Sequence, residues 1–126
     1  MEPDRPEPES QFGIFAKYWQ AGEVKTRLAE SIGPTTAAEI YRHFVVTLLR
    51  RFDDVAAFQE FCIWPPERRY SMEAIAGDWS VSVQCSGDLG ERMRRYFDQA
   101  FQAGRKRVLL IGSDSPNIPR PHIDEA

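Results

Sequence analysis

Four segments of the chain have hydrophobic patterns that are typical of β-strands. Residues 12–16 form a short apolar run bounded by polar residues, and residues 58–64 are interpreted as a second strand that ends at two prolines. In residues 79–83, tryptophan and valine alternate with serine, which predicts a strand with one buried face. Residues 108–111 are apolar throughout, as in a strand at the centre of a parallel sheet.

The clearest helix is predicted between the first two strands. Thr36 and Glu39 match a capping box, in which each side chain binds a free backbone N–H group at the start of a helix. Apolar residues then recur at three- and four-residue spacing as far as Phe52, which gives this helix one broad apolar face. A loop over residues 17–25 is predicted directly after the first strand.

A second amphipathic helix is predicted before the last strand. Asp88 and Glu91 repeat the cap pattern, and Gly104 ends the helix as glycine commonly does. Residues 67–77 predict a further, short helix. This order of strands and helices favours an α/β fold of three layers, in which helices cover both faces of a mostly parallel sheet.

The two ends of the chain differ from this pattern. Residues 1–10 contain four acidic residues and three prolines, and they predict a disordered segment that precedes a single domain over residues 11–126. Because the last predicted strand is followed only by a proline-rich stretch, we expect that domain to be truncated at its C-terminus.

Composition excludes several classes of protein. The formal net charge of −3 argues against nucleic-acid binding, which normally uses a basic excess. The chain contains no apolar run long enough to span a membrane, and its acidic start is unlike a signal peptide. Cys62 and Cys85 lack the spacing of a metal or CxxC site, so we expect reduced, at least half-buried thiols in a cytoplasmic protein.

Other conspicuous side chains have ordinary structural interpretations. Trp64 and Trp79 are expected in the core, and His43 on the surface of the first long helix. The pairs Arg50-Arg51 and Arg68-Arg69 are interpreted as solvated faces.

The loop after the first strand is a candidate for phosphate binding. It holds Lys17, Lys25 and Arg27 together with the flexible Gly22, directly before a predicted helix start. Phosphates are bound by backbone donors, positive charge and helix N-termini, although a solvated basic loop would have the same composition. The loop matches neither GxGxxG nor GxxxxGK[ST], so neither a dinucleotide fold nor a P-loop is predicted.

The segment Gly-Ser-Asp-Ser-Pro after the last strand is a second candidate. Asp114 follows the carboxyl end of that strand, where a carboxylate can hold Mg²⁺ or Mn²⁺ between phosphates. A turn in which Asp114 binds nearby backbone amides explains the same residues equally well.

Three motifs occur in an order that resembles a known family. They are FAK-x₄-G-x-VKTRL, Q-x₂-GDLGERM and GSDSP-x-x-P. Together they resemble a domain of unknown function found in small bacterial GT-A-like proteins, many of which are described as glycosyltransferases of the arsenosugar-biosynthesis type. The arrangement is more distantly similar to phospholactate and molybdenum-cofactor guanylyltransferases.

The resemblance implies roles for particular residues. Lys17, Lys25 and Arg27 would contact the phosphates of a nucleotide-sugar or nucleoside triphosphate, with Lys25 acting in catalysis, and Gly22 would let the backbone approach them. Asp114 would be the catalytic carboxylate that binds the metal.

The middle motif would lie near the base or sugar of the nucleotide, through Gln84, Gly87 and Asp88. A helix cap accounts for Asp88 and Glu91 as well.

Several functional hypotheses remain compatible with the sequence. The resemblance favours a transferase that uses a nucleotide-sugar and an acceptor of unknown identity, and nucleotidyl transfer is the nearest alternative. A non-catalytic remnant or interaction module is a third hypothesis, and it could form a homo-oligomer through an exposed sheet edge.

Overall fold

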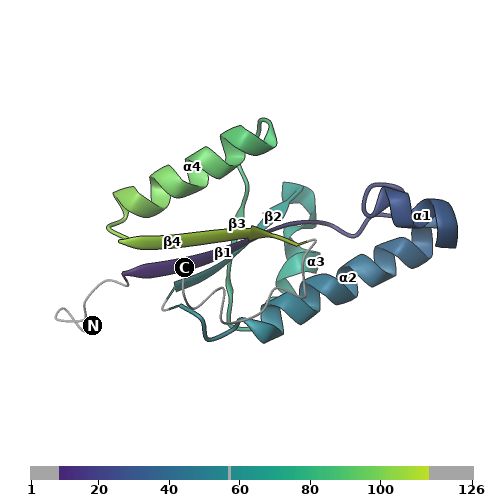
Figure 1. Cartoon of the computed structure of the whole chain (residues 1–126), viewed down its shortest axis with the longest axis horizontal. Coiled ribbons are helices and arrows are strands. Elements are labelled where there is room, and N and C mark those ends of the chain that lie inside the picture. The colour runs from purple at the N-terminus through teal and green to yellow at the C-terminus, as the bar shows by residue number, and fades with distance from the viewer. Residues whose placement is uncertain (1–8, 57, 114–126) are drawn as a thin grey trace.

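The computed structural model of the chain describes residues 9–56 and 58–113 and has a four-stranded parallel sheet with helices on both faces (Figure 1). The α/β fold predicted from the sequence is confirmed. Its elements, in chain order, are β1 (Ser10–Lys17), α1 (Thr26–Ile32), α2 (Pro34–Arg51), β2 (Phe58–Trp64), a 3₁₀ turn (Pro66–Arg68), α3 (Arg69–Glu73), β3 (Ser80–Val83), α4 (Leu89–Gln102) and β4 (Arg107–Gly112).

The strands lie in the order β3-β2-β1-β4, and every neighbouring pair is parallel. Ile14 at the centre of β1 is opposite Phe61 of β2 on one side and Ile111 of β4 on the other. All four carboxyl ends therefore meet at one edge of the sheet, which in parallel α/β folds is the edge that binds ligands.

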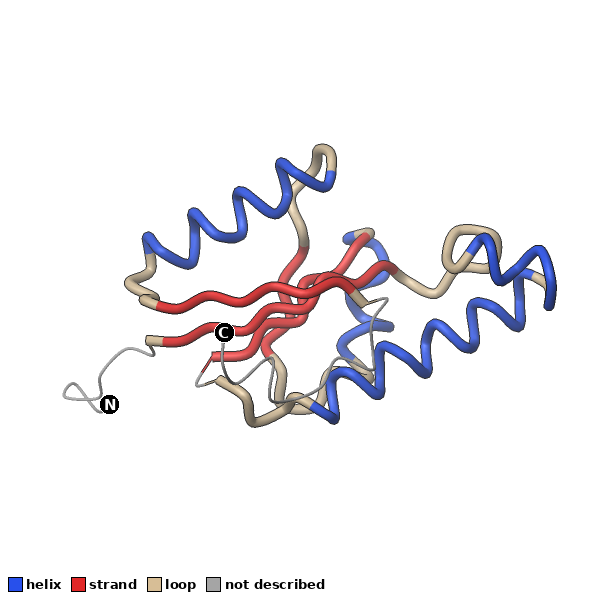
Figure 2. Tube along the Cα trace, in the orientation of Figure 1, coloured by secondary structure: helices blue, strands red, loops and turns tan. Residues whose placement is uncertain are grey.

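The helices divide the molecule into three layers, as expected. Helix α4 covers one face of the sheet, while α2 and α3 lie on the other face and α1 packs beside α2 (Figure 2). The main core lies between the sheet and α2 and joins Phe12 and Ile14 of β1 to Val45 and Leu48 of α2. A smaller cluster, made by Phe15, Cys62 and Tyr96, lies between the sheet and α4.

The predicted start of the long helix was wrong. Helix α2 begins at Pro34 rather than at Thr36, and its N-cap is Gly33, which makes no side-chain cap. Proline suits the first helical position because its φ is already helical. The N–H that proline lacks would have no partner within the helix at this position. Gly33 has a φ of 91°, which lets the chain turn directly from α1 into α2, so the Thr36–Glu39 pattern lies inside the helix.

The strand boundaries required two corrections. Strand β1 begins at Ser10, inside the segment predicted to be disordered, because Glu9 accepts hydrogen bonds from the backbone N–H groups of Lys106 and Arg107. Strand β4, expected at the centre of the sheet, has a single neighbour among the described residues. Its apolar side chains are accordingly half-buried rather than buried.

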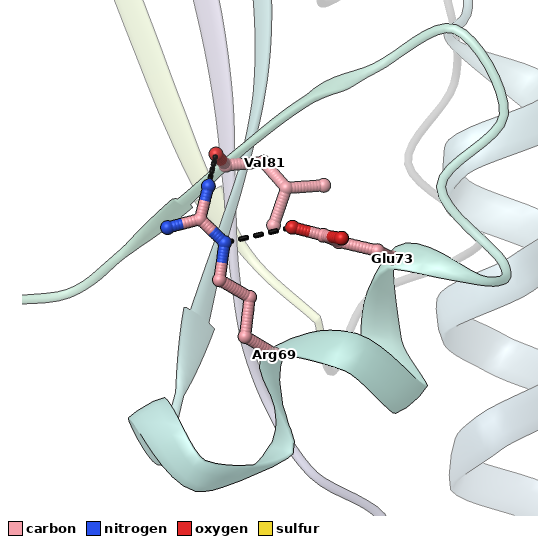
Figure 3. A network of polar contacts seen from close by, with 3 residues as sticks. All are labelled: Arg69, Glu73 and Val81. Atoms are coloured by element: carbon pink, nitrogen blue, oxygen red, sulfur yellow. Dashed lines mark hydrogen bonds and ion pairs between the residues drawn. The ribbon is translucent and has the colours of Figure 1, made fainter.

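Some polar side chains hold the smaller elements in place. Arg69 is exposed, as predicted, and its Nε donates to Glu73 at 2.7 Å and its Nη2 donates to the carbonyl oxygen of Val81 at 3.1 Å (Figure 3). Arg69 therefore connects α3 to β3. Trp79 is buried as predicted, and its indole N–H donates to the carbonyl oxygen of Leu49 at 2.8 Å.

Both cysteines and His43 lie where the sequence predicted them. Cys62 is buried and Cys85 half-buried, both as free thiols, and burial raises the pKa of the Cys62 thiol. His43 lies exposed on α2. In the described part of the chain, no helix is both long and apolar enough to cross a membrane.

Candidate functional site

A cavity of about 370 Å³ opens at the carboxyl edge of the sheet. Every strand contributes to it, directly or through the residues that follow, and so do α2 and the start of α4. Its lining among the described residues consists of Phe15, Ala16, Lys17, Tyr41, Trp64, Gln84, Cys85, Gly87, Leu89, Arg92, Gly112 and Ser113. We call this cavity the carboxyl-edge cleft.

The charged side chains in the described lining of the carboxyl-edge cleft have one sign. Lys17 and Arg92 supply two cations, and the described lining includes no aspartate or glutamate. Trp64 and Leu89 add apolar surface beside them. Two cations beside an apolar wall favour an anionic ligand that also carries a less polar group.

Gln84 organises the floor of the cleft. Its side chain is buried, and its Nε2 donates to the carbonyl oxygens of Ala16 at 3.2 Å and Cys62 at 2.9 Å. Its Oε1 accepts from Nη1 of Arg92 at 2.9 Å. Because both N–H bonds of the amide are used within the protein, Gln84 holds the ends of β1 and β2 together and orients Arg92.

Tyr41 connects two sides of the cleft. Its hydroxyl accepts from the backbone N–H of Lys17 at 3.0 Å and shares a hydrogen bond of 2.5 Å with the hydroxyl of Ser113. Lys17 ends β1 and Ser113 follows β4, so the long helix α2 sets the spacing between these two strand ends.

Asp88 caps helix α4, as its sequence pattern predicted. Its Oδ1 accepts from the backbone N–H of Glu91 at 2.8 Å, and this bond lowers the pKa of the Asp88 carboxyl. The same contact accounts for the position of Asp88 without a ligand, although it directly follows Gly87 of the cleft lining.

The lowered pKa of Asp88 predicts a pH dependence of stability. A carboxyl group whose pKa is lower in the folded state stabilises the fold above its unfolded pKa of about 4, and this contribution disappears as the pH falls through the folded pKa. We therefore expect wild type to have a higher melting temperature than Asp88→Asn near neutral pH, and the difference to shrink on acidification. Melting curves of both proteins between about pH 7 and pH 2 measure this; a difference that does not change with pH would contradict it.

The loop after β1 leaves the cleft. Lys25, the N-cap of α1, has a φ of 50° and places its Nζ 5.1 Å from the ring centre of Phe44. Gly22, Lys25 and Arg27 are absent from the described lining of the cleft, and their predicted phosphate contacts stay predictions.

Cation–aromatic contacts hold the beginning of this loop. Arg68 lies 4.5 Å from the ring centre of Tyr18, and Arg42 lies 5.5 Å from that of Trp19. Arg68 therefore packs on the loop while it remains exposed, as its interpretation as a solvated charge predicted.

The structure thus brings together only some of the predicted site residues. Lys17, Gln84 and Gly87 line one cleft, whereas Asp114 lies outside the described residues, directly after Ser113. Arg92 and Tyr41 were missed, and Trp64 was expected in the core but lies half-exposed in the cleft. Arg92 had one local signal: a cation in the first turn of a helix opposes the helix dipole and calls for another explanation.

Comparison with known proteins identifies a related structure. The chain resembles a crystal structure from Desulfovibrio desulfuricans G20, named a "putative nucleotide-diphospho-sugar transferase", with a TM-score of 0.87 and 36% sequence identity. The match covers 94% of this chain and 53% of that protein, so the chain spans about half of its length. No protein of curated function matches the chain.

The sequence also matches a family directly. Residues 48–126, which include Gln84 and Arg92 of the cleft and also Asp114, match the family described as "Uncharacterized protein conserved in bacteria (DUF2064)". The fold is nucleotide-diphospho-sugar transferase-like, and the chain belongs to the DUF2064 family.

Proposed function

We propose that the carboxyl-edge cleft binds the diphosphate group of a nucleotide-sugar, and that the protein takes part in glycosyl transfer. The observation that carries this proposal is the pair of cations, Lys17 and Arg92, in a cleft without a described carboxylate, at the strand ends of a nucleotide-diphospho-sugar transferase-like fold. A diphosphate supplies the negative charge that such a pair stabilises.

The shape of the cleft agrees with a ligand of this kind. Its volume of about 370 Å³ lies within the range of small-molecule sites. Trp64 and Leu89 offer apolar contacts for a base or sugar ring.

A divalent cation is the second part of the proposal. Asp114 directly follows Ser113 in the cleft, and we assign it to hold Mg²⁺ or Mn²⁺ with the ligand's phosphate oxygens. The described residues contain no group of three potential metal-ligating side chains. That composition fits Mg²⁺, which often binds through one or two carboxylates, water and substrate phosphates. Such a cation would neutralise charge on the leaving diphosphate.

Lys25 and Arg27 are assigned a supporting role in this proposal. Both belong to the segment that runs on from Lys17 at the end of β1. Their charges would add to the attraction for a diphosphate, and Gly22, with a φ of 87°, allows the backbone of this loop to approach the ligand.

A thermal-shift experiment tests this function. Nucleotide-sugars such as UDP-glucose and GDP-mannose, and the nucleoside triphosphates, are added with and without Mg²⁺ or Mn²⁺. A ligand at a hundredfold excess over its Kd stabilises the folded state by about 2.7 kcal/mol, which raises the melting temperature measurably. We expect one class of nucleotide-sugar to act in this way, with the metal, and Lys17→Met and Asp114→Ala to lose the effect.

The matched control is Lys106→Met. Lys106 precedes β4, at the opposite edge of the sheet, and its side chain is 72% exposed. This variant should retain the full shift. Stabilisation by triphosphates alone would indicate nucleotidyl transfer instead, and a cooperatively melting protein that no nucleotide stabilises would overturn the proposed function.

A further inference from the structure

Arg92 occupies a position that is unfavourable for a cation by itself. It lies in the first turn of α4, where the helix dipole is positive, and its side chain is half-buried. Specific contacts hold the guanidinium there.

Three contacts define the position of the guanidinium. Nη1 donates to Oε1 of Gln84 at 2.9 Å, and Nε lies 3.4 Å from the carbonyl oxygen of Asp88. The guanidinium carbon lies 5.9 Å from the ring centre of Trp64. These contacts fix the plane of the group before any ligand arrives, which reduces the entropy lost on binding.

The amide of Gln84 is itself fixed. Because its nitrogen donates to two backbone carbonyls, its oxygen has to face Arg92. A rigid link therefore runs from the strand ends of β1 and β2, through Gln84, to the guanidinium.

Part of the Arg92 guanidinium is available to bind a ligand. Within the described part of the chain, Nη2 of Arg92 donates to no group, and no carboxylate lines the cleft beside it. We infer that Arg92 is the residue that binds the diphosphate oxygens of the ligand, and that Gln84 is its positioning residue. This inference rests on the proposed function and identifies the main anion contact of the site.

Titration calorimetry with inorganic pyrophosphate tests the role of Arg92, since this probe carries the diphosphate group without base or sugar. Hydrogen bonds between a guanidinium and phosphate oxygens are charge-assisted and therefore stronger than neutral ones. We therefore expect Arg92→Met to raise the Kd for pyrophosphate by about tenfold or more. Arg92→Lys should have an intermediate effect, because lysine keeps the charge but cannot donate to Gln84 and to the ligand with one planar group.

The control variant is Arg94→Met in the same helix. The side chain of Arg94 is 85% exposed, and its Nε lies 3.9 Å from the carboxylate of Asp98. The Kd of the Arg94→Met variant for pyrophosphate should stay within about twofold of the wild-type value, because an exposed ion pair contributes little.

The positioning role of Gln84 has its own readout. Gln84→Met should weaken pyrophosphate binding in wild type but not in the Arg92→Met background, since its effect passes through Arg92. An equal loss in both backgrounds would mean that Gln84 is only structural.

The outcomes separate this inference from the proposed function. If Lys17→Met weakens pyrophosphate binding and Arg92→Met does not, the role of Arg92 is wrong and the proposed function stands. If the wild-type protein binds neither pyrophosphate nor any nucleotide, both are wrong.

Discussion

Replacing Gly13 by alanine is expected to destabilise the fold by about 3 kcal/mol. Gly13 lies in the middle of β1 under helix α4, and an added Cβ would stand 2.1 Å from the hydroxyl oxygen of Tyr96 and 2.4 Å from Cζ of its ring. The ring cannot move freely, because it packs edge-on against Phe15 and against Phe97. Helix α4 would have to shift away from the sheet, and we expect the melting temperature to fall by about 10 °C.

Gly112→Ala is the matched control for this substitution. Gly112 also lies in a strand, but an added Cβ there meets no atom of the other described residues within 4 Å. We expect its stability to stay within about 0.5 kcal/mol of wild type.

A double substitution tests the mechanism of the Gly13 effect. Combining Gly13→Ala with Tyr96→Leu removes the ring that causes the clash. The double variant should therefore lose less stability than the sum of the losses in the two single variants. If the two destabilisations simply add, the contact with Tyr96 is not the cause.

Tyr41→Phe is expected to cost about 2 kcal/mol and to weaken nucleotide binding. The substitution removes the shared partner of the Lys17 backbone N–H and of the Ser113 hydroxyl, and an unsatisfied buried group costs about 1–3 kcal/mol. Since Lys17 and Asp114 are assigned to the ligand and its metal, loosening both strand ends should also raise the Kd for the nucleotide identified by the thermal-shift experiment.

Tyr70→Phe is the control for Tyr41→Phe. It makes the same chemical change on a side chain that is 89% exposed, so neither the melting temperature nor the Kd should change. A Tyr41→Phe protein that is destabilised but binds with wild-type affinity would show that Tyr41 supports the fold without organising the site.

Most elements could be predicted because their signals are local. The second strand was predicted over residues 58–64, and β2 has these bounds. The Asp88 cap was identified for the same reason, since it depends on two residues three positions apart. The start of α2 was missed although its signal, Pro34 after Gly33, is also local, because the competing Thr36–Glu39 pattern has the same form as a true capping box.

The candidate site was predicted only in part. Lys17 was identified from the composition of the loop after the first strand, and Gln84 and Gly87 through a family motif, and the structure brings these three together. Arg92 belongs to the same motif but had no assigned role, because its importance depends on contacts with Gln84 and Trp64 that no local pattern shows.

The periodicity of apolar residues and the helix caps by themselves determined the α/β class, the order of elements and the two-sided covering of the sheet, since each of these depends on residues close together in the chain. Tertiary structure alone decided that β4 lies at an edge of the described sheet and that Tyr41 meets Ser113, 72 residues away in sequence. It also decided which cations share a cleft: Lys17 and Arg92 line it, whereas Lys25 packs on Phe44. The physical reason is that hydrophobic patterns specify which face of an element is buried, but strand order and packing determine which buried faces and strand ends meet.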